Sequence, residues 1–351
     1  DSPLIVIAPV ESTSKVAEDD KWRYPLAPKL KVETSTFIGE SPAIPISNLL
    51  ASNDKIELAG VGLHNGADVN LIIKPGEPNS GISFKRIDID GDNTVSANFK
   101  NVVEPILCTK LKNESGITVS TVEHLMAAFF GEGIDNVLVE INGPEVPIMD
   151  GSSNDFVEAI RKVGTKELKS PRKFINVLKK VEIKDGTKFI SIEPLKNDLI
   201  VDFEIVYENP LIRTRRKTFK LSDGDLSEIY ASRTFCLYED IDFIKSQGLA
   251  QGGSLDNAIV VKGNEILNEN GLRNRHEFVY HKILDCLGDL MLSGHRLFGH
   301  VKTSRGGHAL TNKLLIKFFS DSSNWSIEKE SLIDTNNKTS IDTKNPQSIS
   351  V

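Results

Sequence analysis

The pattern of hydrophobic and polar positions indicates a mixture of strands and helices in the first half of the chain. Stretches with apolar residues at alternate positions, or with a short apolar run, predict three strands, near 69–73, 82–84 and 137–141. Apolar residues spaced three and four apart predict a helix over 121–130. A second helix begins near Ser153 and runs toward Val163.

The second half of the chain repeats this mixture. Strands are predicted at 174–185, 187–193, 199–207 and near 297–303. Asp185-Gly186 marks a hairpin turn between the first two of these strands. Helices are predicted at 239–247, at 275–292 and at 309–320, and Gly248 ends the first of them. Two α+β halves of similar size suggest a duplication, although no residue-level repeat accompanies it.

Both ends of the chain differ from this folded body. Six of the fifteen prolines lie in the first 45 residues, and no periodicity is sustained there, so residues 1–50 are predicted to form an extended arm or linker. Residues 326–351 are rich in Ser, Thr, Asn and Lys and contain no aromatic residue, which predicts a flexible tail. Two domains are predicted between the ends, at 51–168 and 173–322, joined by a linker over 164–172.

Composition excludes several classes of protein. The 42 basic and 49 acidic residues give a net charge of −7, which argues against binding to nucleic-acid backbones. No apolar run approaches the roughly 20 residues of a membrane helix, and the N-terminal apolar stretch lacks the features of a secretory signal. Three widely separated cysteines argue against a disulfide framework and against thiolate-bound structural zinc. We therefore expect a soluble, cytoplasmic globular protein.

The helix predicted at 275–292 carries the first candidate site. His281, Asp285 and Asp289 recur every four residues and form a polar stripe on a mostly apolar helix. An imidazole and a carboxylate at this spacing direct two donor atoms to one place, as a metal ion requires. A solvated helix face with a local His–Asp hydrogen bond is the other interpretation, and the spacing alone does not decide between them.

Other polar residues are open to two interpretations as well. Ser120 and Glu123 have the spacing of a capping box, whereas Glu123 and His124 would also suit a general base beside a metal ligand. The glycines before His308 place its imidazole at the mouth of a helix or mark a solvated turn. His64 lies between glycines that most simply mark a turn, because no phosphate-binding pattern follows them.

Seven motifs that include these residues occur in order along the chain. They are Gly60–His64, Ser120–Ala128, Gly143–Ser152, Ser232–Phe235, Gly248–Ser254, His281–Asp285 and Gly307–Lys313. Together they resemble the UDP-3-O-acyl-N-acetylglucosamine deacetylases, the zinc amidases of lipid A biosynthesis in Gram-negative bacteria. The resemblance covers about 55–322 and implies an α+β fold of two similar domains. Each domain would be a sheet layered with helices, and the helices would pack between the two sheets.

The resemblance implies a metal site. His124, His281 and Asp285 match the zinc ligands of the family. Three nitrogen and oxygen ligands leave one position for water, which is typical of a catalytic zinc. Two imidazoles and a carboxylate also suit Fe²⁺, so the metal used in cells stays open.

The resemblance also implies the roles of the residues that move protons and stabilise charge. Glu123 matches the general base and His308 the general acid. Asp289 matches the carboxylate that orients His308 and keeps it protonated. Thr234 matches the residue that stabilises the oxyanion. Hydrolysis of the N-acetyl group would then release acetate and a free amino sugar, the committed step of lipid A biosynthesis.

Substrate contacts follow from the same resemblance. Lys282 and His64 would lie near the nucleotide diphosphate, where cationic donors are useful. Phe235 matches an aromatic residue at the mouth of the site, and Asp240 a contact to the sugar. An apolar passage for the acyl chain is matched by Ile241, Ala250, Gly253, Ser254, Ala258 and Val260. A small core is the competing interpretation of Ala258 and Val260.

The expected partner is a small-molecule UDP-acyl-sugar, and we expect the protein to be a monomer. Two other functions are open: a metal amidase that acts on another N-acetyl sugar, and a catalytically silent relative that binds a sugar or lipid. An aligned acid and base count against the silent relative, because binding alone needs neither.

Overall fold

The computed structural model describes residues 48–329, and their first sheet has five strands in the order β2-β3-β8-β4-β5. The bounds are Ile56–Val61 (β2), Asp68–Pro75 (β3), Ile82–Arg86 (β4), Thr94–Ser96 (β5) and Val137–Ile141 (β8). Neighbouring strands are antiparallel except β4 and β8, which are parallel. Val69, Leu71 and Ile73 are buried on one face of β3, as their alternation predicts.

The second sheet has seven strands, and β18 pairs with three of them. The bounds are Lys173–Val177 (β10), Val181–Asp185 (β11), Lys188–Glu193 (β12), Leu199–Ile205 (β13), Arg215–Lys220 (β14), Arg296–Ser304 (β18) and Trp325–Lys329 (β19). Strand β18 is parallel to β10 and β13 and antiparallel to β12. The predicted hairpin at Asp185-Gly186 is confirmed, but the strand predicted over 174–185 is divided into β10 and β11.

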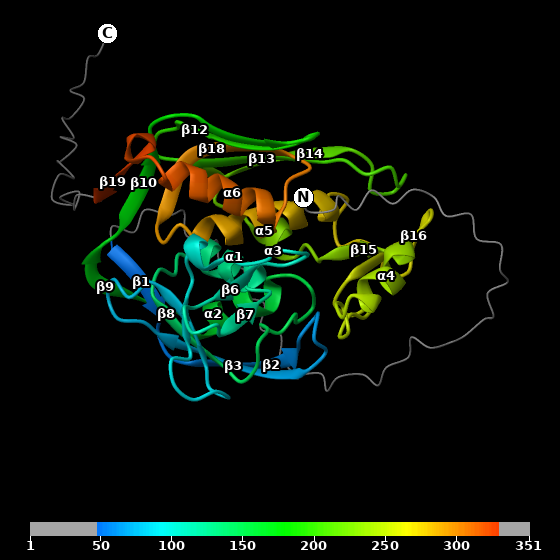
Figure 1. The fold of residues 1–351 in the computed structure, drawn as a ribbon, viewed down its shortest axis with the longest axis horizontal. Coiled ribbons are helices and arrows are strands. Elements are labelled where there is room, and N and C mark those ends of the chain that lie inside the picture. The colour runs from blue at the N-terminus through cyan, green and yellow to red at the C-terminus, as the bar shows by residue number, and fades with distance from the viewer. Residues whose placement is uncertain (1–47, 330–351) are drawn as a thin grey trace, which may run out of the picture. The chain divides into compact units, whose positions relative to one another are not determined.

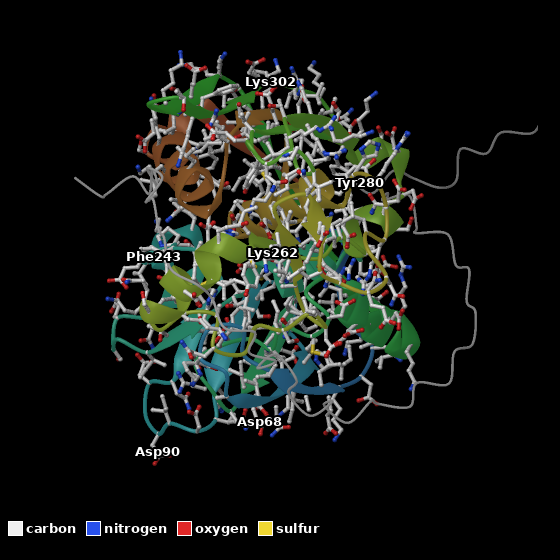
Figure 2. All side chains as sticks on the ribbon, turned by 90° about the vertical axis from the view of Figure 1, so that its right-hand side faces the viewer. Asp68, Asp90, Phe243, Lys262, Tyr280 and Lys302 are labelled. Carbon is white, nitrogen blue, oxygen red and sulfur yellow. The ribbon has the colours of Figure 1, made fainter. Side chains whose placement is uncertain are left out.

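Three helices that matter for the site lie between these sheets (Figure 1). They are α1 (Glu123–Gly131), α5 (Glu277–Met291) and α6 (His308–Phe319), and α2 (Asn154–Val163) packs against α1. Figure 2 shows Lys302 of β18 and Asp68 of β3 at opposite ends of the view, which agrees with two outer sheets. The α+β architecture predicted from the sequence is confirmed, whereas the division into two domains stays a prediction.

A third, smaller sheet lies to one side of these layers in Figure 1. It consists of β15 (Phe235–Leu237), β16 (Ile259–Lys262) and β17 (Glu265–Ile266), with α4 (Ile241–Ser246) beside it. A further pair of short strands is β6 (Lys110–Lys112) and β7 (Thr118–Ser120). The other helical turns are α3 (Ser227–Tyr230), η1 (Phe99–Asn101), η2 (Leu221–Asp223), η3 (Tyr238–Asp240) and η4 (Ser322–Asn324).

Three segments predicted to be irregular are strands. The linker predicted over 164–172 contains β9 (Thr165–Pro171), which pairs with β1 (Asn48–Ser52), so residues 48–50 of the predicted arm are also ordered. Residues 326–329 of the predicted tail belong to β19 and pair with β10. Strand β9 is largely exposed and lacks the apolar alternation from which strands are recognised, whereas β19 has only two apolar residues, Trp325 and Ile327, at alternate positions. The rest of the arm and tail lies outside the described residues.

No helix in the described residues is long and apolar enough to cross a membrane.

Candidate metal and catalytic site

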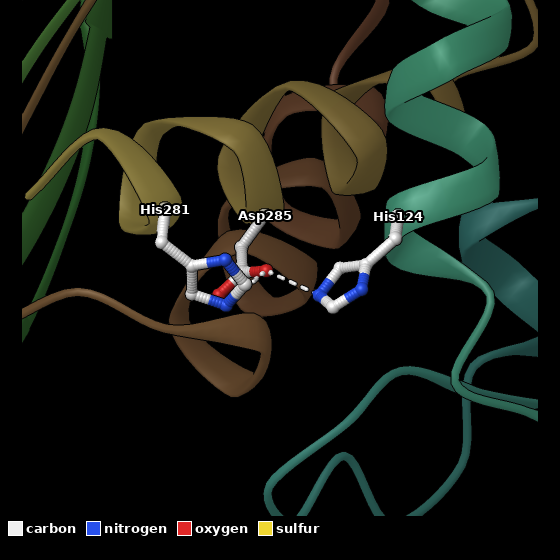
Figure 3. A group of neighbouring side chains, drawn as sticks. All are labelled: His124, His281 and Asp285. Atoms are coloured by element: carbon white, nitrogen blue, oxygen red, sulfur yellow. Dashed lines mark ion pairs between the residues drawn. The ribbon is translucent and has the colours of Figure 1, made fainter. Parts of the chain in front are cut away.

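Three buried side chains from two helices converge between the sheets (Figure 3). His124 is the second residue of α1, and His281 and Asp285 lie one turn apart on α5. The Oδ1 atom of Asp285 is 3.5 Å from Nε2 of His124 and 3.4 Å from Nε2 of His281. One donor atom from each residue lies within 4.8 Å of the other two. The polar stripe of α5 is therefore buried, and its interpretation as a solvated face is wrong.

The two separations from Oδ1 of Asp285 fit a tetrahedral divalent ion. Metal–ligand bonds of about 2.0–2.1 Å place the ligand atoms of such an ion about 3.3 Å apart, close to the two separations observed. Oδ1 of Asp285 is buried and has no hydrogen-bond partner among the described residues. An unpaired buried carboxylate oxygen is unfavourable, and a bound cation would satisfy it.

Protonation of the ligands also suits a metal. Burial lowers the pKa of His281 to about 3, so its ring is neutral. Its Nδ1 lies 3.1 Å from the carbonyl oxygen of Ser232, which accepts the ring proton and leaves the lone pair on Nε2. Burial alone would raise the pKa of Asp285, but His281 and Lys282 lower it well below its ordinary value. Nζ of Lys282 is 2.5 Å from Oδ2 of Asp285, so Oδ1 is left for the ion.

The close approach of α1 and α5 depends on Gly288. A Cβ atom at this position would lie 2.1 Å from the carbonyl oxygen of Glu123 and 3.2 Å from the backbone nitrogen of Ala127. Only a residue without a side chain allows the two backbones to approach this closely. Gly288 follows Asp285 by three residues on α5, and Glu123 precedes His124 on α1, so this contact limits how far apart the two ligands lie.

Glu123 does not cap its helix. Helix α1 begins at Glu123, and in the described structure its N-cap residue Val122 makes no side-chain cap bond. Ser120 lies in β7 and donates to the carbonyl of Pro144 at 3.2 Å. The capping-box interpretation is wrong because Thr121, at φ 56°, redirects the chain between Ser120 and the helix.

The carboxylate of Glu123 instead faces the site. Its Oε2 accepts a hydrogen bond from the backbone N–H of Thr109 at 3.0 Å. Burial raises the pKa of Glu123, although the nearby His308 and His124 act in the opposite direction. A carboxylate that is more basic than usual is better able to accept a proton from water.

His308 is the first residue of α6, as its glycines predicted, and it is buried rather than solvated. Its Nδ1 is 2.8 Å from Oδ2 of Asp289, and its Nε2 is 3.7 Å from Oε1 of Glu123. Burial alone would lower the pKa of His308, but Asp289 and Glu123 outweigh it and raise the pKa to about 9. The ring is therefore charged at neutral pH.

Sequence reasoning missed Thr109. Its hydroxyl donates to Oδ1 of Asp289 at 2.6 Å and lies 3.1 Å from Nδ1 of His308. Thr109 lies just before β6, and no motif or spacing relates it to α5 or α6. Only the folded chain brings it to the site.

His64 is a neutral donor, not the cation that was expected. Its Nδ1 accepts a hydrogen bond from the backbone N–H of Ala250 at 3.4 Å, so the ring proton is on Nε2. Nε2 is buried and has no partner within residues 48–329. Burial lowers the pKa of His64, although Glu145 partly opposes it. Oε1 of Glu145 also accepts a hydrogen bond from the backbone N–H of His64 at 2.8 Å.

The other predicted substrate contacts lie on or beside the third sheet. The ring of Phe235 is 6.3 Å from His281 and 5.7 Å from Tyr207, a residue that sequence reasoning missed. Thr234 precedes β15 and is fixed by a hydrogen bond from its N–H to the carbonyl of Gly151 at 2.8 Å. Asp240 ends η3. Ile241, Ala258 and Val260 are buried, which suits both a passage wall and a small core.

The loop with Ala250, Gly253 and Ser254 lies against the loop of His64. Backbone N–H groups of Gln251 and Gly252 donate to the carbonyls of His64 and Leu63, at 3.1 and 3.0 Å. A Cβ atom on Gly252 would lie 2.2 Å from the carbonyl oxygen of Gly62, so this glycine allows the contact. The third sheet is thereby joined to the first half of the chain.

Known proteins are similar in sequence to this chain over about three quarters of its length. A model of the family described as UDP-3-O-acyl N-acetylglycosamine deacetylase matches residues 51–320. The chain belongs to this deacetylase family. UDP-3-O-acyl-N-acetylglucosamine deacetylases from Actinobacillus succinogenes and Aliivibrio fischeri are each 42% identical over 273 residues, which are 77% of this chain and 89% of the relative. The Photobacterium profundum enzyme is 41% identical over 269 residues, 76% of this chain and 88% of the relative.

The match to the deacetylase family includes every candidate residue described above. It begins within β1 and ends one residue after α6, so it covers both large sheets except β19. The buried His124, His281 and Asp285 are consistent with a metal site in this family member.

Proposed function

We propose that this chain is a metal-dependent deacetylase that hydrolyses the N-acetyl group of UDP-3-O-acyl-N-acetylglucosamine in lipid A biosynthesis. One observation carries the proposal: a basic carboxylate and a protonated imidazole, Glu123 and His308, lie 3.7 Å apart beside a buried His/His/Asp set. The named activity of the relatives supports the choice of substrate. A binding protein would have no need of a matched acid and base.

His124, His281 and Asp285 would hold the ion, Zn²⁺ or Fe²⁺. Such an ion, when bound, polarises an amide carbonyl and lowers the pKa of water. Glu123 takes a proton from the attacking water as the water oxygen bonds to the acetyl carbon. Thr234 donates to the oxyanion that develops on the carbonyl.

His308 completes the reaction. Its Nε2–H donates a proton to the sugar nitrogen as the C–N bond breaks, which gives acetate and a free amine. Asp289, hydrogen-bonded to Nδ1, holds the ring in position and favours its charged form before the transfer. The charge of His308 at neutral pH agrees with this direction of proton transfer.

Substrate binding follows the same proposal. The buried Nε2–H of His64 and the ammonium of Lys282 would donate to the diphosphate, Phe235 would lie at the mouth, and Asp240 would contact the sugar. The acyl passage would be lined by Ile241, Ala250, Gly253, Ser254, Ala258 and Val260. Monomeric state and cytoplasmic location stay predictions, which sedimentation and cell fractionation would check.

Glu123→Gln tests the proposal. An amide oxygen can still accept the N–H of Thr109, but the amide cannot take a proton from water at neutral pH. We expect acetate release from UDP-3-O-acyl-N-acetylglucosamine to fall roughly 10²–10⁴-fold, the usual contribution of a general base, with metal content unchanged. Glu132→Gln is the control, because Glu132 is a buried carboxylate at the other end of α1.

Three results would contradict the proposal in different ways. Glu123→Gln turnover at the wild-type rate would exclude Glu123 as the base. If the wild-type protein releases acetate only from a different N-acetyl sugar, it is a related amidase. An absence of acetate release from any such substrate, with or without added metal or chelator, would indicate a silent binding protein.

A further inference from the structure

The hydroxyl of Thr109 contacts both the proposed proton donor, His308, and its carboxylate partner, Asp289. It is 2.6 Å from Oδ1 of Asp289 and 3.1 Å from Nδ1 of His308. A hydroxyl has one proton, and the shorter contact to a carboxylate oxygen takes it. The Thr109 oxygen therefore faces Nδ1 with a lone pair, so Nδ1 must carry a proton in addition to the proton on Nε2.

The same residue holds the proposed base through its backbone. The N–H of Thr109 donates to Oε2 of Glu123 at 3.0 Å. With Oε2 held, Oε1 is the oxygen that faces Nε2 of His308, at 3.7 Å. Thr109 thus contacts the proposed base, Glu123, through its backbone N–H. Its hydroxyl contacts both the imidazole of the proposed acid, His308, and the carboxylate of Asp289 that holds this imidazole.

The hydroxyl of Thr109 is a buried donor to Asp289. Its side chain is 1% exposed. A small cavity next to it is lined by Asp289, His308 and Asn312 on the polar side and by Val102, Leu292 and Leu315 on the apolar side. Removal of the hydroxyl would leave Oδ1 of Asp289 without its donor in a buried place.

We infer that Thr109 is a positioning residue that fixes the base and the acid of the reaction relative to each other. The inference rests on the proposed roles of Glu123 and His308. Its hydroxyl orients the Asp289–His308 pair, and its N–H orients Glu123. Thr109 itself exchanges no proton with the substrate.

Thr109→Val and Thr109→Ser separate this role from simple packing. Valine has the shape of threonine without the hydroxyl, and serine keeps the hydroxyl without the methyl group. Both variants retain the backbone N–H to Glu123, so the comparison isolates the hydroxyl. We expect Thr109→Val to lower kcat roughly 10–100-fold with little change in KM and metal content, and Thr109→Ser to remain within a few-fold of wild type.

A second measurement does not depend on turnover. In the metal-free protein, the hydrogen-bonded Nδ1 proton of His308 should give a downfield NMR signal, assigned by its absence in His308→Gln. We expect this signal to persist in Thr109→Ser and to broaden or disappear in Thr109→Val. Thr303→Val is the control for loss of a buried threonine hydroxyl, since that hydroxyl donates to the carbonyl of Phe189 in the second sheet.

Equal losses of kcat in Thr109→Val and Thr109→Ser would overturn the inference, because the methyl group would then be what matters. Wild-type kcat and an unchanged NMR signal in Thr109→Val would overturn it as well. If Thr109→Val does not fold, wild-type kcat and signal in Thr109→Ser support the inference and their loss refutes it. A wild-type chain that releases no acetate would refute the proposed function instead, and the NMR comparison would still judge the positioning of His308.

Discussion

Gly288→Ala should damage the metal site without touching any ligand. The added Cβ would lie 2.1 Å from the carbonyl oxygen of Glu123, whereas ordinary contact begins at 3.4 Å. The obstacle is backbone on both sides, so no side chain can turn away to make room. The two helices must separate by about 1.3 Å at this point, or bend by a similar amount.

The consequences can be estimated from the geometry. His124 lies on α1 and the other two ligands lie on α5, so only the distances to His124 increase. An ion would keep two ligands and lose the third. We expect metal content to fall clearly and kcat/KM to fall roughly 10²-fold, as a displacement of about 1 Å in a catalytic site can produce. Overpacking should cost about 1–3 kcal/mol of folding free energy.

The assay compares metal content, kcat/KM and thermal unfolding of Gly288→Ala with those of Gly143→Ala. A Cβ on Gly143 would meet only Val69, at 3.9 Å, so this control should behave like wild type. If the displacement of His124 is the cause, Gly288→Ala should remove little further metal from a His124→Ala background. Full metal content and full activity in Gly288→Ala would refute the idea that Gly288 sets the distance across the site.

Two further predictions concern the metal ligands and the proposed acid and base. His281→Ala should lose the metal, whereas His308→Ala should keep it and be slow in the chemical step; equal metal loss, measured by elemental analysis, would contradict these roles. The rate of acetate release should rise with pH as Glu123 loses its proton. It should fall near pH 9 as His308 loses its proton, because Asp289 and Glu123 raise the pKa of His308 to about 9. Asp289→Asn should move the alkaline limb of the pH profile of kcat to lower pH. An alkaline limb that stays in place in this variant would exclude the titration of His308 as the origin of the limb.

Parts of the site could be predicted from the sequence because they depend on local periodicity. The spacing of His281 and Asp285 places both on one helix face wherever that helix lies. The partnership with His124 depends on how α1 packs against α5, and Thr109 reaches Asp289 only through the fold. The family motifs supplied the first of these relations but not the second.

Local patterns also misled in specific places. Ser120 and Glu123 have the letters of a capping box, but the left-handed backbone of Thr121 separates them. Strand β9 is recognised only by its hydrogen-bonded partner β1, because few of its side chains enter a core. Strand β19 is recognised by its partner β10, because Trp325 and Ile327 are its only apolar residues. Apolar alternation detects a strand through burial, so exposed ribbons escape it.

The metal ligands come from two helices that are far apart in the chain, and this has a thermodynamic consequence. An unfolded chain cannot present His124 together with His281 and Asp285, so an ion that binds this set stabilises the folded state alone. A free ion concentration 100 times Kd would add about 2.7 kcal/mol to the free energy of unfolding. In a cell that runs short of the ion, the protein would thus lose conformational stability as well as turnover, and proteolysis could lower its abundance.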